Sequence, residues 1–233
     1  MMSGKYDTLF TPAGYAFSIW GLIYLLLFGF VIYQSRSLFT KVRDDAFIER
    51  TGWWFILSCI ANSAWCYLFV IDSILISTFV IFFMLFCVLQ IVIRNAMELW
   101  DAPISVIVFL WWPFVIYSGW LTVACIANVT LYLTKIGWDG FGISAETWTL
   151  IMIGVATFIN LIVTWKRNMR EFALVGAWAL VAIAVANADG AKSIINTAYV
   201  AAGILIASSL IHALKNRATN PVKKCVEYMT GTK

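Results

Sequence analysis

Residues 102–134 have the sequence APISVIVFLWWPFVIYSGWLTVACIANVTLYLT, a run of 33 residues without a single charge. A helix that crosses the hydrocarbon core of a bilayer needs about 20 mostly apolar residues. The run is therefore too long for one straight span and too short for two. Pro113 lies inside it, where a helix loses a hydrogen bond and tends to kink. Whether the run crosses once or twice fixes the topology of all that follows it.

Six other uncharged runs are long enough to cross a membrane. Hydrophobic residues make up 62% of the 233 residues and charged residues only 12%, whereas a soluble domain carries about 25% charged residues. A lone apolar segment in lipid must satisfy its own backbone hydrogen bonds, so each run has to be a helix. The sequence predicts an all-α integral membrane protein with seven transmembrane helices, at about 12–34, 52–71, 74–93, 106–132, 147–165, 172–188 and 193–214.

The distribution of basic residues decides between one and two crossings of 102–134. Loops on the cytoplasmic side of a membrane carry an excess of Lys and Arg. With one crossing, 13 of the 16 basic residues lie on one side and 3 on the other, whereas two crossings give 7 against 9. One long, kinked or tilted helix is therefore predicted. The N-terminus is expected outside and the basic C-terminal tail in the cytoplasm of a bacterial inner membrane.

The spans themselves contain no charge, and this excludes several functions. Without an intramembrane Lys there is no retinal Schiff base, and without intramembrane carboxylates a proton pump is not expected. The only histidine, His212, falls near the inner end of the last span, as an interfacial residue or as a haem axial ligand. The loops show no nucleophile–base pair and no phosphate loop, so we expect no enzyme. The formal charge of +4 does not indicate a nucleic-acid partner.

Polar, uncharged groups and tryptophans remain at membrane depth. The amides are Asn62, Gln90, Asn128 and Asn160, and the tryptophans inside spans are Trp20, Trp65, Trp120 and Trp178. Buried amides must find partners, and between membrane helices they either bridge neighbouring helices or orient a ligand. The indoles either pack as large core residues or form the wall of a pocket for a flat, hydrophobic, partly polar ligand.

Three motifs place these residues in order along the chain. Residues 11–24 have the sequence TPAGYAFSIWGLIY, residues 62–65 have NSAW followed by Phe69, and residues 120–124 have WLTVA followed by Asn128. In order and spacing they resemble the tryptophan-rich sensory protein family, TspO/MBR, whose mitochondrial member is the translocator protein. The resemblance covers about residues 11–132. It implies a TspO-like core at 1–134, with added helices at 135–214 and a polar basic tail at 215–233.

The resemblance also implies a function and a site. Members of the family bind porphyrins, haem and sterols in a cavity between helices. Carried over to this chain, the ligand-binding residues would be Trp20, Tyr24, Asn62, Trp65, Phe69, Trp120, Ala124 and Asn128. No metal and no required cofactor are implied, although a tetrapyrrole is a candidate bound group. The expected partners are the lipid bilayer, a hydrophobic small molecule and, as a candidate, a second copy of the chain.

Two other functions fit the same sequence. One is a transporter of a small uncharged or lipophilic solute. The other is a non-catalytic structural subunit of a membrane complex, docked through the helices at 135–214. A receptor or carrier for a planar hydrophobic ligand remains the leading hypothesis, because the mid-depth Trp and Asn residues and the three motifs both point to it.

Overall fold

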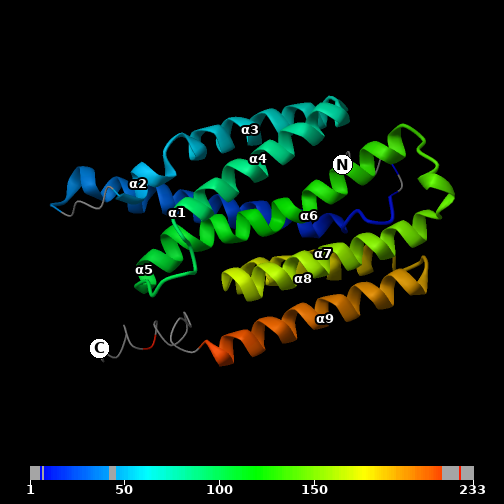
Figure 1. Ribbon diagram of the computed structural model, residues 1–233. Helices are drawn as coiled ribbons and strands as arrows, with labels where there is room; N and C mark the ends of the chain where they lie inside the picture. The colour runs from blue at the N-terminus through cyan, green and yellow to red at the C-terminus, as the bar shows by residue number, and fades with distance from the viewer. Residues whose placement is uncertain (1–5, 7, 42–45, 217–225, 227–233) are drawn as a thin grey trace.

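The computed structural model describes residues 6, 8–41, 46–216 and 226, and every element among them is helical. The long helices run roughly side by side in an elongated bundle (Figure 1). The elements are η2 (Gly14–Ser18), α1 (Ile19–Phe39), α2 (Ala46–Thr51), α3 (Trp53–Val70), α4 (Ile74–Arg94), α5 (Ile104–Val106), η3 (Ile107–Trp111), α6 (Trp112–Lys135), η4 (Gly140–Gly142), α7 (Ala145–Arg167), α8 (Arg170–Ala186) and α9 (Lys192–Lys215). The predicted tail 215–233 lies, after Asn216, almost wholly outside the described residues.

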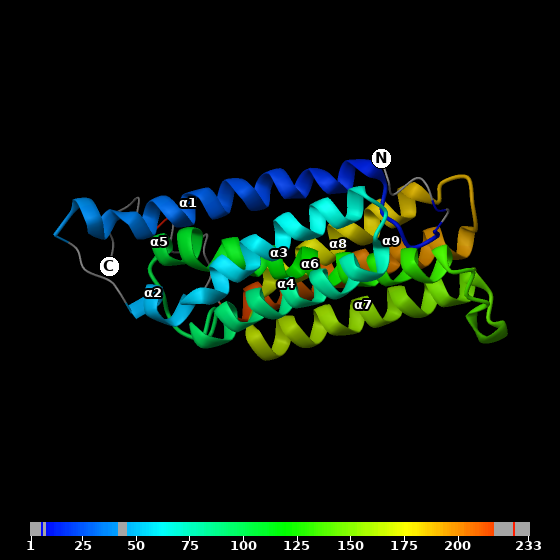
Figure 2. The same cartoon turned by 90° about the horizontal axis from the view of Figure 1, so that it is seen from above.

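Six helices of the described chain are long and apolar enough to cross a membrane, so the chain is an integral membrane protein. The predicted count of seven is not confirmed, because α8 has only 17 residues. A left-handed residue, Asn168 (φ 59°), ends α7, and α8 begins two residues later at Arg170. Most of α8 is alanine or another residue buried inside the bundle. It lies against α6, α7 and α9 (Figure 2).

The run around Pro113 forms one continuous helix over Ile104–Lys135, which confirms the prediction of a single long span. The irregularity predicted at the proline takes the form of the π-helical turn η3, which ends immediately before Trp112. Proline has no N–H to donate and its ring collides with the carbonyl one turn earlier. A π turn relieves both problems by widening the helix locally.

Two other predicted boundaries shift. Pro12 was expected in the first turn of a helix beginning at residue 12, but it precedes the 3-10 turn η2, and α1 begins at Ile19. At its other end α1 continues to Phe39, where Arg36 lies over the ring of Tyr33 at 3.5 Å. Arg36 is the first charged residue after the uncharged run, and this contact places its guanidinium against an aromatic ring near the end of α1.

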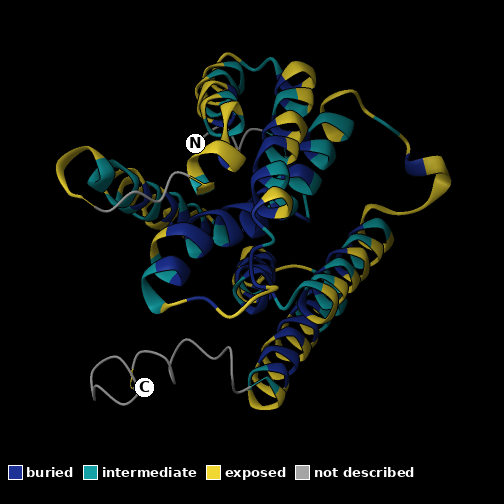
Figure 3. Ribbon diagram, turned by 60° about the vertical axis from the view of Figure 1, so that its left-hand side comes forward, coloured by how far each residue is buried: buried dark blue, intermediate teal, exposed yellow. Residues whose placement is uncertain are grey.

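The long helix containing α6 is the most deeply buried of the six spans, and α3 is the most exposed. α6 packs against α4 on one side and α8 on the other, α3 packs against α4, and α9 packs against α7 and α8. Figure 3 shows exposed residues along the outward faces of the peripheral helices and buried residues toward the interior. In a bilayer those outward apolar faces contact lipid.

The segment before α1 is held by α8, which is far away in sequence. Ala13 N–H donates to Ala182 O at 3.0 Å, and Trp178 Nε1 donates to Ala16 O at 3.3 Å. Gly119 allows α6 and α8 to approach closely, because it has no side chain at their contact. A Cβ at this position of α6 would lie 3.1 Å from Phe172 O of α8. The predicted division at residue 134 stays a prediction, but α8 packs directly against η2 and α6.

Candidate ligand site

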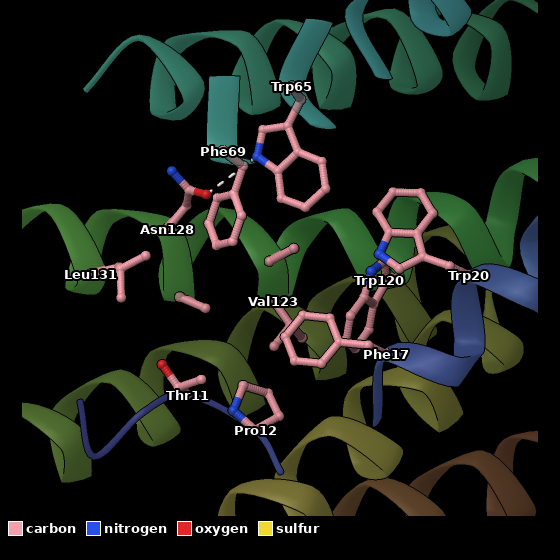
Figure 4. A pocket seen from close by; sticks show the side chains of 12 residues that line it. Thr11, Pro12, Phe17, Trp20, Trp65, Phe69, Trp120, Val123, Asn128 and Leu131 are labelled. Atoms are coloured by element: carbon pink, nitrogen blue, oxygen red, sulfur yellow. Dashed lines mark hydrogen bonds between the residues drawn. The ribbon is translucent and has the colours of Figure 1, made fainter. Parts of the chain in front are cut away.

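Three tryptophans from three helices, α1, α3 and α6, meet in the structure. Trp20 of α1 lies 5.8 Å from Trp65 of α3 and 6.5 Å from Trp120 of α6, measured between ring centroids (Figure 4). The Trp20 and Trp120 rings meet edge to face, an arrangement that aromatic quadrupoles favour. The three motifs that the sequence placed far apart therefore converge at one point.

The local spacing along each helix explains how the side chains reach this point. Residues four apart lie on one helix face. Trp65 and Phe69 accordingly have ring centroids 5.2 Å apart, and Trp20 and Tyr24 lie 5.6 Å apart. On α6, Trp120, Ala124 and Asn128 follow the same four-residue spacing along one face.

A small cavity lies among these side chains, with a volume of about 40 Å³. Of the eight predicted residues, six line it: Trp20, Trp65, Phe69, Trp120, Ala124 and Asn128. The remaining lining residues are Thr11, Pro12, Phe17, Val123, Ala127 and Leu131. None of the lining residues is ionisable, so the cavity is electrically neutral. Its volume is far below the roughly 300–1,000 Å³ of a small-molecule pocket.

The other two predicted residues, Tyr24 and Asn62, line a neighbouring groove between α1 and α3, with a volume of about 280 Å³. Three of its lining residues are joined by hydrogen bonds. Tyr24 OH donates to Asn62 Oδ1 at 3.0 Å, and Asn62 Nδ2 donates to Tyr117 OH at 3.1 Å. Trp20 separates groove from cavity, because it lines the cavity and its ring contacts both Tyr24 and Tyr117.

Asn128 is satisfied entirely by neighbouring helices. Its Oδ1 accepts from Trp65 Nε1 at 3.2 Å, and its Nδ2 donates to Ser77 Oγ at 3.1 Å and to Thr78 Oγ1 at 2.7 Å. The sequence allowed this amide either to bridge helices or to orient a ligand. In the structure it bridges helices.

Trp120 differs from the other polar residues of the cavity. It is 1% exposed, and its Nε1 is buried without a hydrogen-bond partner in the described part of the chain. A buried donor without a partner costs about 1–3 kcal/mol. A ligand with an acceptor oxygen in the cavity would recover that free energy.

Sequence reasoning missed several residues around the site. Tyr117 connects the groove to α4, since its hydroxyl lies 2.9 Å from Met84 Sδ. Phe17 contacts the Trp120 ring edge to face at 5.7 Å. The sequence could have identified Tyr117, because it lies three residues before Trp120 and residues three apart share a helix face. Phe17 reaches the site only through η2, which the sequence did not predict.

The remaining mid-depth candidates lie elsewhere. The amide of Asn160 faces Gly176 of α8, and Trp178 packs edge to face on Tyr15 at 5.2 Å. His212, in the last turn of α9, is 1% exposed, and its Nε2 lies 3.0 Å from Asn168 Oδ1. It belongs to a polar cluster at the inner end of the bundle, and it does not line the cavity.

Glu98 is a buried acid of that cluster. It is 3% exposed, in the loop between α4 and α5, and its backbone carbonyl accepts from Asn168 Nδ2 at 3.0 Å. Burial, reinforced by the negative charge of Glu171 and opposed by Arg170, raises the pKa of Glu98 to about 8. The cluster connects the α4–α5 loop to the α7–α8 turn.

The comparison with protein families matches residues 1–211 to the family described as TSPO-like protein. The match therefore includes α7, α8 and most of α9, which lie beyond the 11–132 covered by the motif resemblance. No curated protein and no solved structure matches the chain significantly. The span of the family match, together with a helical membrane bundle in which the three motifs converge, places this chain in the TSPO-like protein family.

Proposed function

We propose that this protein is a TspO-like membrane receptor or carrier for a planar hydrophobic ligand, of porphyrin, haem or sterol type. The observation that supports it best is the buried Nε1 of Trp120, which has no hydrogen-bond partner among the described residues and belongs to a cavity lined by three tryptophans. Flat aromatic walls favour a flat apolar ligand. The free indole donor favours one with an oxygen acceptor, such as a carboxylate or a hydroxyl.

Binding requires the cavity to enlarge, because about 40 Å³ cannot hold a tetrapyrrole or a sterol. The enlargement we propose is a rotation of the Trp20 side chain. Trp20 separates the cavity from the groove of about 280 Å³ between α1 and α3, and its movement would join the two spaces. The combined space would reach the size of a ligand pocket and would bring Tyr24 and Asn62 into contact with the ligand.

The groove also supports a route for the ligand. Phe28 and Val31, which line it, are 64% and 43% exposed on the outer surface of α1. In a membrane this surface faces lipid, so a lipophilic ligand can enter laterally without crossing water. Transport of a lipophilic solute, the second candidate function, would use the same route. In both cases the proposed role is binding rather than catalysis, in a bacterial inner membrane with the N-terminus outside.

The Trp120 donor provides the test. Trp120→Phe keeps an aromatic ring and removes the N–H. A hydrogen bond to a charged acceptor contributes about 1.5–3 kcal/mol, so the dissociation constant for protoporphyrin IX should rise by about 10- to 150-fold. Binding is measured from the porphyrin absorbance during titration of purified protein. The matched control is Trp111→Phe, because Trp111 is also 1% exposed with an unpartnered Nε1 but does not line the cavity.

The outcomes separate clearly. Weaker binding in Trp120→Phe with unchanged binding in Trp111→Phe supports the site. Absence of porphyrin and sterol binding by the unmodified protein contradicts the function, and equal affinities in both variants contradict the position of the site.

A further inference from the structure

A second and larger cavity lies at the outer end of the molecule, between α4, α6 and α7. Its volume is about 430 Å³, within the range of small-molecule pockets. The segment Thr8–Phe10 and the α6–α7 loop, through Trp138, Asp139, Gly140 and Ile143, line part of its wall. The loop projects beyond the ends of α6 and α7 (Figure 2).

This cavity is separate from the tryptophan cavity. No residue lines both. α6 lies between them, because Val123, Ala127 and Leu131 line the tryptophan cavity while Ile126, Val129 and Leu133 line the outer one. The contacts between α6 and α7 are few compared with those that α6 makes with α4 and α8, so these two helices leave space between them.

The loop over this cavity has a defined structure. Trp148 Nε1 donates to Gly140 O at 2.8 Å, and Asp139 Oδ1 accepts from Phe141 N–H at 3.0 Å. Gly140 has φ +68°, and a Cβ there would lie 3.1 Å from the Trp148 ring, so only glycine fits without displacing the loop. Trp138 lies 5.4 Å from Trp148 between ring centroids. Trp138 and Trp148 thus form an aromatic pair at the loop end of the cavity, which we call the Trp138–Trp148 roof.

The residues that line this cavity include one charged side chain among those described, and they become more polar toward the α6–α7 loop. Toward the membrane interior it is apolar, with Phe82, Ile126 and Met152. The hydroxyls of Thr130 and Thr149 donate to backbone carbonyls one turn earlier, and their oxygens keep a free lone pair. Among the described lining residues, Asp139 carries the only charge, and it lies at the outer end. An anionic head group beside this carboxylate would be repelled, whereas a neutral or cationic one would be tolerated or attracted.

We infer that this outer cavity binds a single-chain amphiphile with a neutral or cationic head group. The head lies beside Asp139 under the Trp138–Trp148 roof, and the chain runs between α6 and α7 toward Phe82 and Met152. The volume fits one chain rather than a phospholipid with two chains and its head group. This inference does not depend on ligand binding at the tryptophan cavity.

The test uses three photoreactive probes with the same twelve-carbon diazirine chain: dodecanol, dodecylammonium and dodecanoate. The full-length protein is placed in nanodiscs of phosphatidylglycerol, so that the bulk lipid is anionic. Cross-links are mapped by mass spectrometry. We expect saturable labelling within residues 126–152 by the alcohol and the ammonium probe, at least fivefold above labelling by the carboxylate.

Two variants locate the binding. Met152→Trp fills the cavity and should reduce labelling at least tenfold, whereas Ile151→Trp, at a neighbouring position that is 40% exposed, should not. Asp139→Asn keeps an acceptor for Phe141 N–H and removes the charge, so it should abolish the discrimination against dodecanoate. Thermal unfolding of each variant verifies that it is folded. Asp139→Asn, which changes no packing, keeps the test valid if Met152→Trp does not fold.

Three results would overturn the inference. Equal, unsaturable labelling by all probes would mean that bulk lipid fills the cavity. Labelling that Ile151→Trp reduces as strongly as Met152→Trp would place the probe on the helix surface. Replacement of the nanodisc lipid by phosphatidylethanolamine supplies a two-chain lipid with an ammonium group, and loss of labelling there would assign the cavity to membrane lipid rather than to a single-chain amphiphile.

Discussion

Asn128 joins three helices through one side chain. From α6 it accepts a hydrogen bond from Trp65 of α3 and donates to Ser77 and Thr78 of α4. Each of these groups is at membrane depth, where no water replaces a lost partner. The amide thus fixes the position of Trp65 at the edge of the cavity and joins α4 to α6.

Replacement of Asn128 should therefore destabilise the protein. Asn128→Ala leaves the Trp65 Nε1 donor without its acceptor, and we expect the free energy of unfolding to fall by about 1–3 kcal/mol. Asn196→Ala, at an exposed position of α9, is the matched control and should change it by less than about 0.5 kcal/mol. Reversible unfolding in mixed micelles provides the measurement, and equal effects of the two substitutions would contradict this role of Asn128.

Because of Glu98, we expect the stability of the folded protein to fall as the pH rises. Burial and the nearby Glu171 raise the pKa of Glu98 from 4.5 to about 8, so the folded protein holds a proton that the unfolded chain has released between these values. Protons bound by the folded state alone make its stability fall as the pH rises. This stabilisation is complete below pH 4.5 and is lost as the pH rises to about 8.

The unfolding temperature should accordingly be higher at pH 5.5 than at pH 8.5. Glu98→Gln, which keeps the shape and removes the titration, should flatten this difference. Glu49→Gln, at an exposed position on α2, should leave it unchanged. A slope of opposite sign, or one that persists in Glu98→Gln, would assign the pH dependence to another group.

At the scale of elements, the crossing of α6 and α8 depends on Gly119. A Cβ at this position would lie 3.1 Å from Phe172 O, 3.2 Å from Phe172 Cα and 3.2 Å from Val175 Cβ. Two of these atoms are backbone, so no side chain can rotate away, and α8 itself would have to move. Because α8 holds Ala13 and Ala16 before α1, such a movement would reach the segment that lines the tryptophan cavity.

Gly119→Ala should therefore lower the free energy of unfolding by about 1–3 kcal/mol, as overpacked helix contacts do. Gly154→Ala on α7 is the matched control, because nothing lies within 4 Å of its added Cβ. It should be neutral or stabilising by up to about 1 kcal/mol, since alanine favours the helix. The prediction fails if both alanines are neutral in the same unfolding experiment.

At the scale of the whole molecule, the ends of the bundle differ in charge. Arg36, Arg94, Arg167 and Lys215 lie in the last turns of α1, α4, α7 and α9. These four helices end on the side that carries the α4–α5 loop (Figure 1). The opposite end carries the α6–α7 loop. The positive-inside rule predicts that the Arg-rich end lies in the cytoplasm.

Two exposed phenylalanines allow this orientation to be measured. Phe141, in the α6–α7 loop, is 81% exposed, and Phe39, at the end of α1, is 85% exposed. In a chain without its native cysteines, Phe141→Cys should react with a membrane-impermeant maleimide in intact spheroplasts. Phe39→Cys should react only after permeabilisation. The reverse pattern would invert the topology.

The sequence alone was sufficient for six membrane spans, for the single long helix around Pro113 and for six of the twelve residues that line the tryptophan cavity. Spans follow from the transfer of local stretches of chain into lipid, which depends on composition over about 20 residues. Residues four apart on one helix share a face whatever the helix packs against, so the spacing from Trp120 to Asn128 already placed them together.

The tertiary structure decided what depends on contacts between distant segments. In it, α8 is a short, buried neighbour of α6, and the amide of Asn128 is hydrogen-bonded to other helices. The Nε1 of Trp120 has no partner in the described part of the chain, and Tyr24 and Asn62 line the groove beyond Trp20. Whether a buried polar group has a partner, and whether space remains between helices, depends on how separate helices pack. A periodic sequence pattern specifies the face of a helix but not the neighbour that covers it.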